Sequence, residues 1–570
     1  MSRVACRHPD LSAITGVVPD LSPDHVASLA TSLGLPAYSD DLEEVTHRLN
    51  AFLEALGALR DLPLNSQEPV PAWPVAHRVD RGTTGEPLPA SPSPVPARGS
   101  GDSSLVHRSA TELAELIKTG ALSPVTLVEA YLTRIARLDG DLRAYITVCE
   151  DAALAEAQRA EASAARGVIA GPLHGVPFAV KDQFDTAGVR TTAGSRLLAE
   201  HVPTIDAPVV ARLRAAGGIL LGKLNMTEFA LGGTLDFPFG QPRNPWNRLH
   251  DPGGSSSGSG IAAAAALAGF TLGEDTGGSV RSPAAWCGAV GLRPTWGLVS
   301  RAGCFPLSWS MDAAGPLTRT VEDAAVVLGV MAGPDRRDPL LRQTPPDDVR
   351  TRLHAGVRGL KVGLVRELTL GRDTDPEVRA AVRAAADVLG SLGAIVDEVS
   401  IPLVPLAGAV FMAIADSEGA GLHRGWLTTR ARDYDAGTRR RLLTAGLLPT
   451  TVYHQATRAR ALIRAQVLEA LERVDVLLAP AGPRPAPPIA AMRAAVTSKE
   501  EAAARFFTRR SYTTAFSLAG TPAVAVPCGL SSSGLPIGVQ IAGRPFDEAT
   551  VLRAAWAYEQ ATPGRRPPLD

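Results

Sequence analysis

Hydrophobic residues recur at two different periods along the chain. Between 22 and 62 they return every three or four positions, the spacing of helices that bury one face. Short apolar runs bounded by glycine or proline, which are typical of buried strands, lie at 176–180, 217–222, 360–365, 474–480 and 522–527. Helical spacing alternates with these runs, for example after Ser109 and over 122–138. The pattern predicts an α/β fold, with a mixed, largely parallel central sheet covered by helices on both faces.

A change in composition separates the N-terminal helical pattern from the α/β body. Residues 63–103 are rich in Pro, Gly and Ser, which is typical of an extended, poorly packed linker. We therefore expect a helical region at 1–62, a linker at 63–103 and an α/β body at 104–570. Because a short helical pair buries little surface alone, region 1–62 is expected to dock on the body.

Charge and cysteine content exclude several classes of function. The net charge of −1 gives no global field that would attract nucleic acid or an anionic membrane. The five cysteines are scattered without a CxxC pair, which argues against a disulfide framework or a zinc site. No signal-peptide pattern is present, and the apolar stretch 261–272 is too short for a membrane span. We expect a cytoplasmic protein that acts on a small molecule without a cofactor or metal.

Two serine clusters embedded in glycine flank one apolar segment. They read PGGSSSGSG at 252–260 and GEDTGGSVR at 273–281. The alanine-rich run at 261–269 favours a helix, which would place the first loop at a helix N-terminus. If Ser279 is a nucleophile, nearby amides can bind a negative oxygen, although the glycines alone could form only a tight turn. The candidate amides are those of Thr276, Gly277, Gly278 and Ser279.

Lys181 ends the apolar run at 176–180 in a chain that uses arginine almost everywhere. Only five of the 57 basic residues are lysine. Arginine stays protonated in proteins, whereas a buried lysine can lose its proton and act as a base. Asp182 follows Lys181, so an exposed ion pair is the alternative interpretation. Serines together with a desolvated lysine point to acyl transfer without histidine.

Three segments together resemble the amidase signature family of serine hydrolases. They are GPLHGVPFAVKD, PGGSSSGSG and GEDTGGSVRSPAAWCGAVGLRPT, and the resemblance extends over about 104–562. It implies a Ser–cis-Ser–Lys triad in which Ser279 attacks, Ser255 relays the proton and Lys181 is the base. The supporting positions that also match are Ser256, Asp275 and Arg281.

Several positions depart from the family or carry less weight. Glu274 stands where the family usually has Thr, either as a substrate-recognition feature or as a structural replacement, and we favour the replacement. His174 lies in the lysine motif, where relatives carry it without a catalytic role. A stretch that lines the pocket in relatives contains Cys304, Phe305 and Trp309. These three side chains form either an apolar pocket wall or ordinary core.

The complete triad predicts an amidase that hydrolyses carboxylic amides, with esters, anilides or carbamates as further substrates. One alternative is a biuret-, allophanate- or urea-type hydrolase, and another is a non-catalytic binding protein. A third is the catalytic subunit of a tRNA-dependent amidotransferase, although glutaminase members carry an amine-binding acid where this chain has Arg509 and Arg510. Residues 24–59 resemble the C subunit of those amidotransferases, or form a generic helical hairpin. The resemblance also allows a homodimer.

Overall fold

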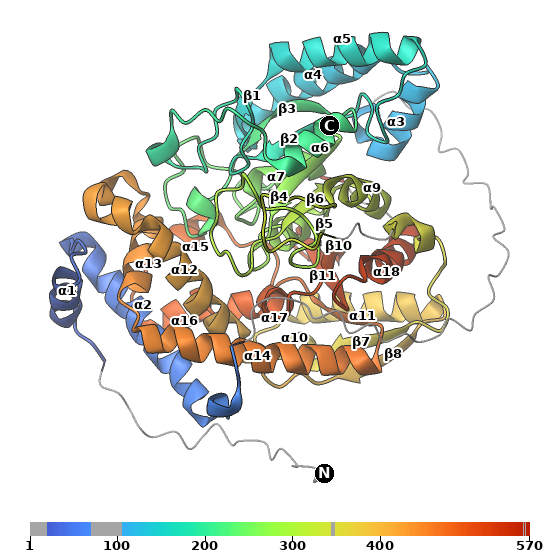
Figure 1. The fold of residues 1–570 in the computed structure, drawn as a ribbon. Helices are drawn as coiled ribbons and strands as arrows, with labels where there is room; N and C mark the ends of the chain where they lie inside the picture. The colour runs from blue at the N-terminus through green and yellow to red at the C-terminus, as the bar shows by residue number, and fades with distance from the viewer. Residues whose placement is uncertain (1–19, 70–104, 344–347, 563, 565, 570) are drawn as a thin grey trace.

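The central element of the computed structural model is an 11-stranded sheet (Figure 1). The structure describes residues 20–69, 105–343, 348–562, 564 and 566–569. The strands are β1 (Tyr145–Val148), β2 (Pro177–Lys181), β3 (Ile219–Leu224), β4 (Phe270–Glu274), β5 (Val290–Arg293), β6 (Ala314–Thr318), β7 (Lys361–Val365), β8 (Ile395–Val399), β9 (Val476–Pro480), β10 (Ala523–Leu530) and β11 (Pro536–Gly543). All five predicted strands are present, as β2, β3, β7, β9 and β10.

The sheet is mixed, as expected, but its pairing differs from the prediction. The strand order is β1-β3-β2-β4-β6-β5-β10-β11-β9-β7-β8. Of the ten neighbouring pairs, four are parallel and six are antiparallel, so the expected predominance of parallel pairs is wrong. The two ends of the sheet follow the parallel rule, with β3-β2-β4 at one end and β9-β7-β8 at the other. The middle is built from the β10–β11 hairpin and from β5 and β6, which need no long crossovers.

Helices surround the sheet. They are α1 (Pro23–Ser32), α2 (Ser39–Gly57), α3 (Ala110–Lys118), α4 (Pro124–Leu142), α5 (Glu150–Ala165), α6 (Pro208–Ala215), α7 (Ser257–Ala264), α8 (Arg281–Cys287), α9 (Val321–Met331), α10 (Arg366–Thr369), α11 (Pro376–Ser391), α12 (Ala407–Thr429), α13 (Ala436–Gly446), α14 (Thr450–Arg473), α15 (Ile489–Arg493), α16 (Lys499–Phe506), α17 (Ser511–Ala519) and α18 (Glu548–Ala561). The predicted helix after Ser109 is confirmed, because the Ser109 side chain accepts a hydrogen bond from the Glu112 amide and caps α3.

Two hydrophobic cores lie on opposite faces of the sheet. Along β9, Val476 and Leu478 belong to the core that includes α11 and α18, whereas Leu477 and Ala479 belong to the core that includes α12, α14 and α17. This alternation is the period of two that a strand imposes. Every residue of β9 is buried, so its continuous apolar sequence reflects burial on both faces.

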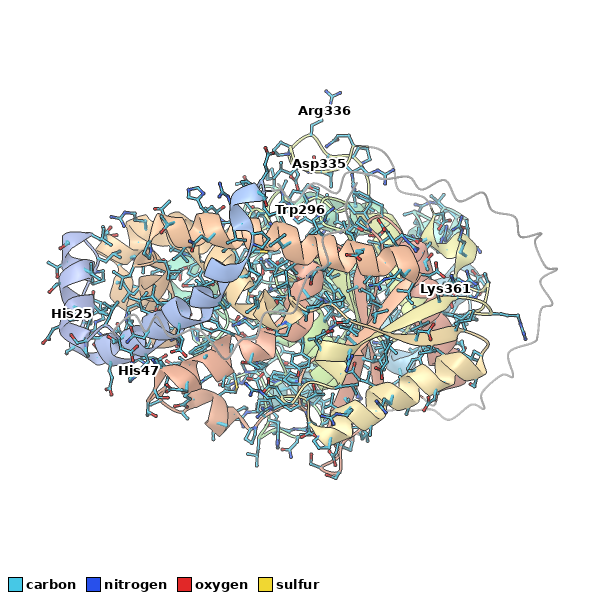
Figure 2. The ribbon with its side chains drawn as sticks, turned by 90° about the horizontal axis from the view of Figure 1, so that it is seen from below. His25, His47, Trp296, Asp335, Arg336 and Lys361 are labelled. Atoms are coloured by element: carbon cyan, nitrogen blue, oxygen red, sulfur yellow. The ribbon has the colours of Figure 1, made fainter. Side chains whose placement is uncertain are left out.

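The N-terminal helices α1 and α2 pack on the outside of the body, beside α12, α13 and α16 (Figure 1). His25 and His47 mark them in Figure 2, at the opposite end of the molecule from Lys361 in β7. Buried Asp41 in α2 accepts hydrogen bonds from Arg439 and Arg440 in α13. The helical pair expected between 22 and 62 is therefore present and docked. Most of the expected linker, residues 70–103, lies outside the described residues.

Two parallel strands bring the predicted chemistry together. Strands β2 and β4 pair in parallel, with Val180 opposite Leu272, so their carboxyl ends lie at the same edge of the sheet. Lys181 is the last residue of β2 and Glu274 is the last residue of β4. Helix α7 connects the first serine cluster to β4, and the Ser259 hydroxyl in α7 donates to the Leu272 carbonyl at 3.1 Å. Both serine clusters therefore converge on the end of β2.

Candidate active site

The Lys181 ammonium group lies in a fully buried position and contacts both serine segments. Its Nζ donates to Ser255 Oγ at 2.8 Å and to the Glu274 carbonyl at 3.3 Å. It also lies 3.2 Å from Glu274 Oε2. The lysine side chain is 0% exposed and Ser255 is 2% exposed. The alternative of an exposed Lys181–Asp182 pair is wrong, because both residues are buried and Asp182 contacts Lys223 instead.

The backbone joins the first serine cluster to the second. The Gly254–Ser255 peptide bond is cis, as the family resemblance implies for this serine. The Ser256 amide donates to the Ser279 carbonyl at 3.2 Å, and the Ser256 hydroxyl donates to the Glu274 carbonyl at 3.2 Å. Ser279 itself is partly exposed, unlike Lys181 and Ser255. The structure thus places an accessible serine beside a buried serine–lysine pair.

The glycines at 277 and 278 let this loop pack closely against its neighbours. A Cβ atom on Gly277 would lie 2.4 Å from the Phe411 ring. Gly278 has a φ of +121°, and a Cβ there would meet the Thr513 hydroxyl at 2.3 Å. Thr513 also donates to the Gly277 carbonyl at 2.6 Å. Side chains from α12 and α17 therefore fix the path of the loop that carries Ser279.

Three of the four predicted oxyanion donors are free in the described part of the chain. The amides of Thr276, Gly277 and Ser279 donate to no acceptor there. The Gly278 amide donates to Asp275 Oδ1 at 2.7 Å, so it already serves to hold the loop. Free amides next to an accessible serine are candidates for stabilising a developing negative oxygen, so this role stays a prediction.

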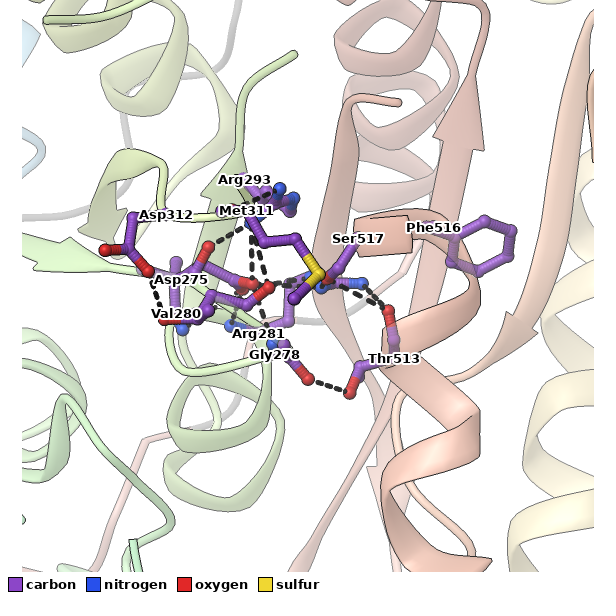
Figure 3. A network of polar contacts seen from close by, with 12 residues as sticks. Asp275, Gly278, Val280, Arg281, Arg293, Met311, Asp312, Thr513, Phe516 and Ser517 are labelled. Carbon is purple, nitrogen blue, oxygen red and sulfur yellow. Dashed lines mark hydrogen bonds and ion pairs between the residues drawn. The ribbon is translucent and has the colours of Figure 1, made fainter. Parts of the chain in front are cut away.

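Asp275 holds the glycine loop through two buried arginines (Figure 3). Arg281 binds its carboxylate with two hydrogen bonds of 3.0 Å, and Arg293 Nη1 lies 3.3 Å from Oδ1. Burial raises the pKa of Asp275, but the charges of Arg281 and Arg293 outweigh it and hold the pKa well below the usual value. The carboxylate is therefore ionised and keeps the amides of the loop oriented. Sequence reasoning found Asp275 and Arg281 but missed Arg293, although it lies in the motif GLRPT.

The Glu274 carboxylate is buried and contacts Lys181, so this position contributes a charged group beside the predicted base. Thr276 Oγ1 lies 2.7 Å from Glu274 Oε1 and 2.8 Å from Asp312 Oδ1. One hydroxyl proton serves only one of these contacts, so the other requires a protonated carboxyl. Burial, followed by the charge of Glu274, raises the pKa of Asp312 to about 8, which makes Asp312 the protonated partner at neutral pH. Asp312 was missed by the sequence analysis, although it lies only three residues after Trp309.

The three predicted pocket residues have different surroundings. Cys304 Sγ accepts a hydrogen bond from Gln183 at 3.1 Å, and burial raises the pKa of its thiol well above the usual value. The Phe305 ring packs against Phe229 with 4.8 Å between centroids. Trp309 is 51% exposed. Both alternatives, an apolar pocket wall and ordinary core, stay predictions for these residues.

His174, in the lysine motif, has contacts that hold the backbone. The two ring nitrogens of His174 contact the backbone of Ala170 and Ala160, at 3.2 and 3.0 Å.

Within the described residues, no group of three or more His, Cys, Asp or Glu side chains is arranged to hold a metal ion. No described helix is long and apolar enough to cross a membrane.

Known proteins with similar sequences share this framework. The family model named Amidase matches residues 126–552. The A subunit of the glutamyl-tRNA(Gln) amidotransferase from Moorella thermoacetica is 40% identical over 491 residues, which cover 82% of this chain and 99% of the relative. The corresponding protein from Roseiflexus sp. is 41% identical over 484 residues, which cover 80% of this chain and 97% of the relative.

Solved structures agree with the sequence comparison. A chain from a vestigial protein complex, which bears on the evolutionary origins of an s-triazine catabolic enzyme, is 36% identical with a TM-score of 0.74. The match covers 81% of this chain and all of that one. The peptide amidase from Stenotrophomonas maltophilia is 35% identical with a TM-score of 0.70, over 81% of this chain and 98% of that chain. The chain belongs to the amidase signature family and is an enzyme of the class that acts on C–N bonds.

Proposed function

We propose that the chain breaks the C–N bond of a carboxylic amide through an acyl-enzyme on Ser279. Neutral Lys181 accepts a proton from Ser255, which accepts one from Ser279 as its oxygen attacks the carbonyl carbon. The free amides of Thr276, Gly277 and Ser279 stabilise the oxyanion. Ser255 then returns a proton to the leaving nitrogen. A second nucleophile attacks the acyl-enzyme, with the same residues accepting its proton and returning one to Ser279.

One observation carries this proposal. The buried Lys181 Nζ lies 2.8 Å from Ser255 Oγ, and the neighbouring residue Ser256 is hydrogen-bonded to the segment that presents Ser279 to solvent. An amine that has lost its proton is the form that accepts one, and the 2.8 Å contact places the Lys181 nitrogen within proton-transfer distance of the Ser255 hydroxyl. Esters, anilides or carbamates would react by the same steps.

The fate of the acyl group and the ammonia defines two candidate functions. Two relatives that match this chain over almost their full length are A subunits of glutamyl-tRNA(Gln) amidotransferases, at 40% and 41% identity. They favour the first candidate, in which this chain releases ammonia from glutamine for a partner protein. This candidate ranks above the stand-alone amidase on the strength of the sequence comparison.

A specific observation favours the second candidate, an amidase that transfers the acyl group to water without a partner. Arg509 and Arg510 occupy the stretch where the resemblance implies an acid that binds the glutamine amine. In addition, α1 and α2 of this chain already cover α13 and α16 through ion pairs such as Arg440–Asp41 and Lys499–Glu54. This region would act as a built-in counterpart of a small helical subunit.

Ammonia release separates these candidates. The purified chain is assayed with L-glutamine, with simple aliphatic and aromatic amides and with biuret, alone and after addition of an amidotransferase B subunit. Hydrolysis of simple amides by the chain alone supports the amidase. Glutaminase activity that requires the added B subunit supports the amidotransferase, and release from biuret alone supports the urea-type alternative. No reaction with any amide, together with no covalent adduct on Ser279, would contradict the proposed chemistry.

A further inference from the structure

Arg510 has no hydrogen-bond acceptor for its side chain within the described part of the chain. It ends the short 3-10 helix η10 (Thr508–Arg510), directly before α17. Its Nε atom is fully buried and without a partner. The residue as a whole is partly exposed, so its outer nitrogens are open to a ligand, while the buried Nε is a donor of the kind that is normally satisfied.

The free donors of Arg510 lie beside an accessible glycine. Arg510 Nη2 lies 3.3 Å from the position that a Cβ atom on Gly232 would occupy. Arg441 Nη1, which also lacks a partner, lies 3.7 Å from the same position. Gly232 is partly exposed. Arg510 Nη2 and the unpaired Arg441 Nη1 therefore converge on one partly exposed position.

This spot borders both segments of the candidate active site. On one side, the Gly232 amide donates to Thr227 Oγ1 at 3.1 Å, and the Thr227 amide donates to the Ser255 carbonyl at 3.1 Å. On the other side, Thr513 lies three residues after Arg510 and donates to the Gly277 carbonyl. A ligand group beside Arg510 would therefore lie next to the segments that carry Ser255 and Ser279.

The charges around Arg510 leave it without a counterion. Its main electrostatic neighbours are the guanidinium groups of Arg441, Arg509 and Arg48, and the single carboxylate of Asp416. That carboxylate is bound by Arg441, with Nε 3.0 Å from Oδ1. Burial, reinforced by Arg441 and Arg509, lowers the pKa of Arg510 well below the usual value. An anion would provide both the missing acceptor and the missing charge.

We propose that Arg510 determines substrate specificity by binding an anionic group of the amide substrate. The inference rests on the proposed acyl-enzyme chemistry of Ser279 and names its substrate class: amides with a second, carboxylate-like group and no ammonium group near it. Monoamides of dicarboxylic acids fit this description. L-glutamine fits less well, because its ammonium group would approach the same cationic cluster.

Matched covalent probes test whether Arg510 binds an anionic group of the substrate. Alkyl fluorophosphonates with three- to five-carbon tails are prepared with either a terminal carboxylate or a terminal methyl group, and the labelling rate of Ser279 is measured by intact mass. For the best tail length, the carboxylate probe is expected to label the wild type about tenfold faster or more, since a charge-assisted hydrogen bond is worth about that factor. Arg510→Gln abolishes this preference, and Arg510→Asp shifts it to an ammonium-tailed probe.

Arg509→Gln is the matched control. Arg509 is the adjacent arginine, but its guanidinium lies over the Trp286 ring at 5.4 Å, so its loss should leave the preference unchanged. The methyl-tailed probe should label Arg509→Gln at the wild-type rate, and measurable labelling of Arg510→Gln by the same probe shows that this variant is folded and reactive. Hydrolysis of glutaric acid monoamide, pentanamide and L-glutamine then gives the same order in kcat/KM.

Two results would overturn the inference. One is equal labelling of the wild type by the carboxylate and methyl probes, and the other is a preference that survives Arg510→Gln. Labelling by no probe would instead contradict the proposed function. In that case the affinities of the wild type for glutarate and for pentanamide are compared by calorimetric titration. This measurement still tests Arg510, because binding requires no reactive serine. Equal affinities for the two compounds would overturn the inference.

Discussion

Two buried lysines on neighbouring strands, Lys181 in β2 and Lys223 in β3, have nearly the same surroundings. Each ammonium group contacts one hydroxyl, one backbone carbonyl and one carboxylate. For Lys181 these lie on Ser255 and Glu274, at 2.8 to 3.3 Å. For Lys223 they lie on Thr191, Phe184 and Asp182, at 2.5 to 3.2 Å. Both lysine side chains are 0% exposed.

The two sites differ in what lies beyond the hydroxyl. The Thr191 hydroxyl donates to the Val189 carbonyl two residues away, so its contacts end within a buried turn. Ser255, by contrast, precedes a residue that is hydrogen-bonded to the segment of partly exposed Ser279, where three amides are free. A buried lysine beside a hydroxyl is thus equally compatible with structure and with catalysis. What distinguishes the Lys181 site is the partly exposed serine and the unpaired backbone amides of the segment joined to it.

Loss of the exposed hydroxyl should have the largest effect on the Lys181 site. Ser279→Ala is expected to lower kcat/KM by about 10⁵-fold or more, because the nucleophile of an acyl-enzyme mechanism has no substitute. Ser259→Ala removes another buried serine hydroxyl, in α7, and is expected to keep near-wild-type activity. Rates are measured with the best amide found in the ammonia assay. Comparable activity in the Ser279 and Ser259 variants would make the two lysine sites equivalent.

Removing each lysine tests the comparison directly. Lys181→Met is expected to lower kcat by about 10³-fold or more, since the base is lost. Lys223→Met should keep kcat within a few-fold of the wild type. Both variants leave a buried carboxylate unpaired, which costs about 3 kcal/mol or more, so both should unfold at a lower temperature.

Activity is therefore expressed per folded protein, with the unfolding temperature measured for each variant. A similar loss of kcat in both lysine variants would mean that stability, rather than proton transfer, explains the Lys181 effect.

The carboxylates next to the lysines provide a smaller and more specific test. Glu274→Gln replaces the buried carboxylate 3.2 Å from Lys181 Nζ with a neutral amide of nearly the same shape. It is expected to lower kcat by about tenfold, because Lys181 loses a charge-assisted contact that positions its Nζ atom. Asp182→Asn makes the same change beside Lys223 and should leave kcat within a few-fold of the wild type. An unchanged kcat in Glu274→Gln would remove Glu274 from the positioning of Lys181.

The last prediction concerns Asp312, whose expected effect appears in stability rather than rate. Its pKa is raised to about 8 in the folded protein, from an unfolded value near 4, so its protonation stabilises the fold below about pH 4. This contribution is lost as the pH rises through about 8. Asn mimics the protonated acid, so the unfolding temperature of the wild type should fall relative to Asp312→Asn between pH 4 and 8. Parallel curves for the two proteins would show that Asp312 is ionised throughout.

The sequence alone predicts much of the Lys181 site, but for reasons that depend on the family motif. Rare lysine in an apolar strand is a property of Lys223 as much as of Lys181, so this argument does not separate them. The serine–glycine clusters and their order distinguish Lys181 from Lys223, because the parallel β2–β4 pair places the ends of these two strands at one edge of the sheet. The helix after the first cluster was also predictable, although it begins at Ser257, within the cluster.

Contacts between distant segments were beyond the sequence pattern. Thr513 contacts Gly277 across 236 positions, and Arg441 and Arg510 converge on Gly232 from separate helices. The use of the Gly278 amide by Asp275 depends on loop geometry that a glycine pair does not specify. The antiparallel middle of the sheet was missed for a related reason: a continuous apolar run indicates burial on both faces without indicating strand direction.

The most direct test of the account is to label the wild type, Lys181→Met and Lys223→Met with the same fluorophosphonate. Peptide mass mapping then locates and quantifies the adduct after a fixed time. We predict an adduct on Ser279 in the wild type and in Lys223→Met, and little or none in Lys181→Met. Equal labelling of Ser279 in both lysine variants, or an adduct at another residue, would contradict activation of Ser279 through Ser255 and Lys181.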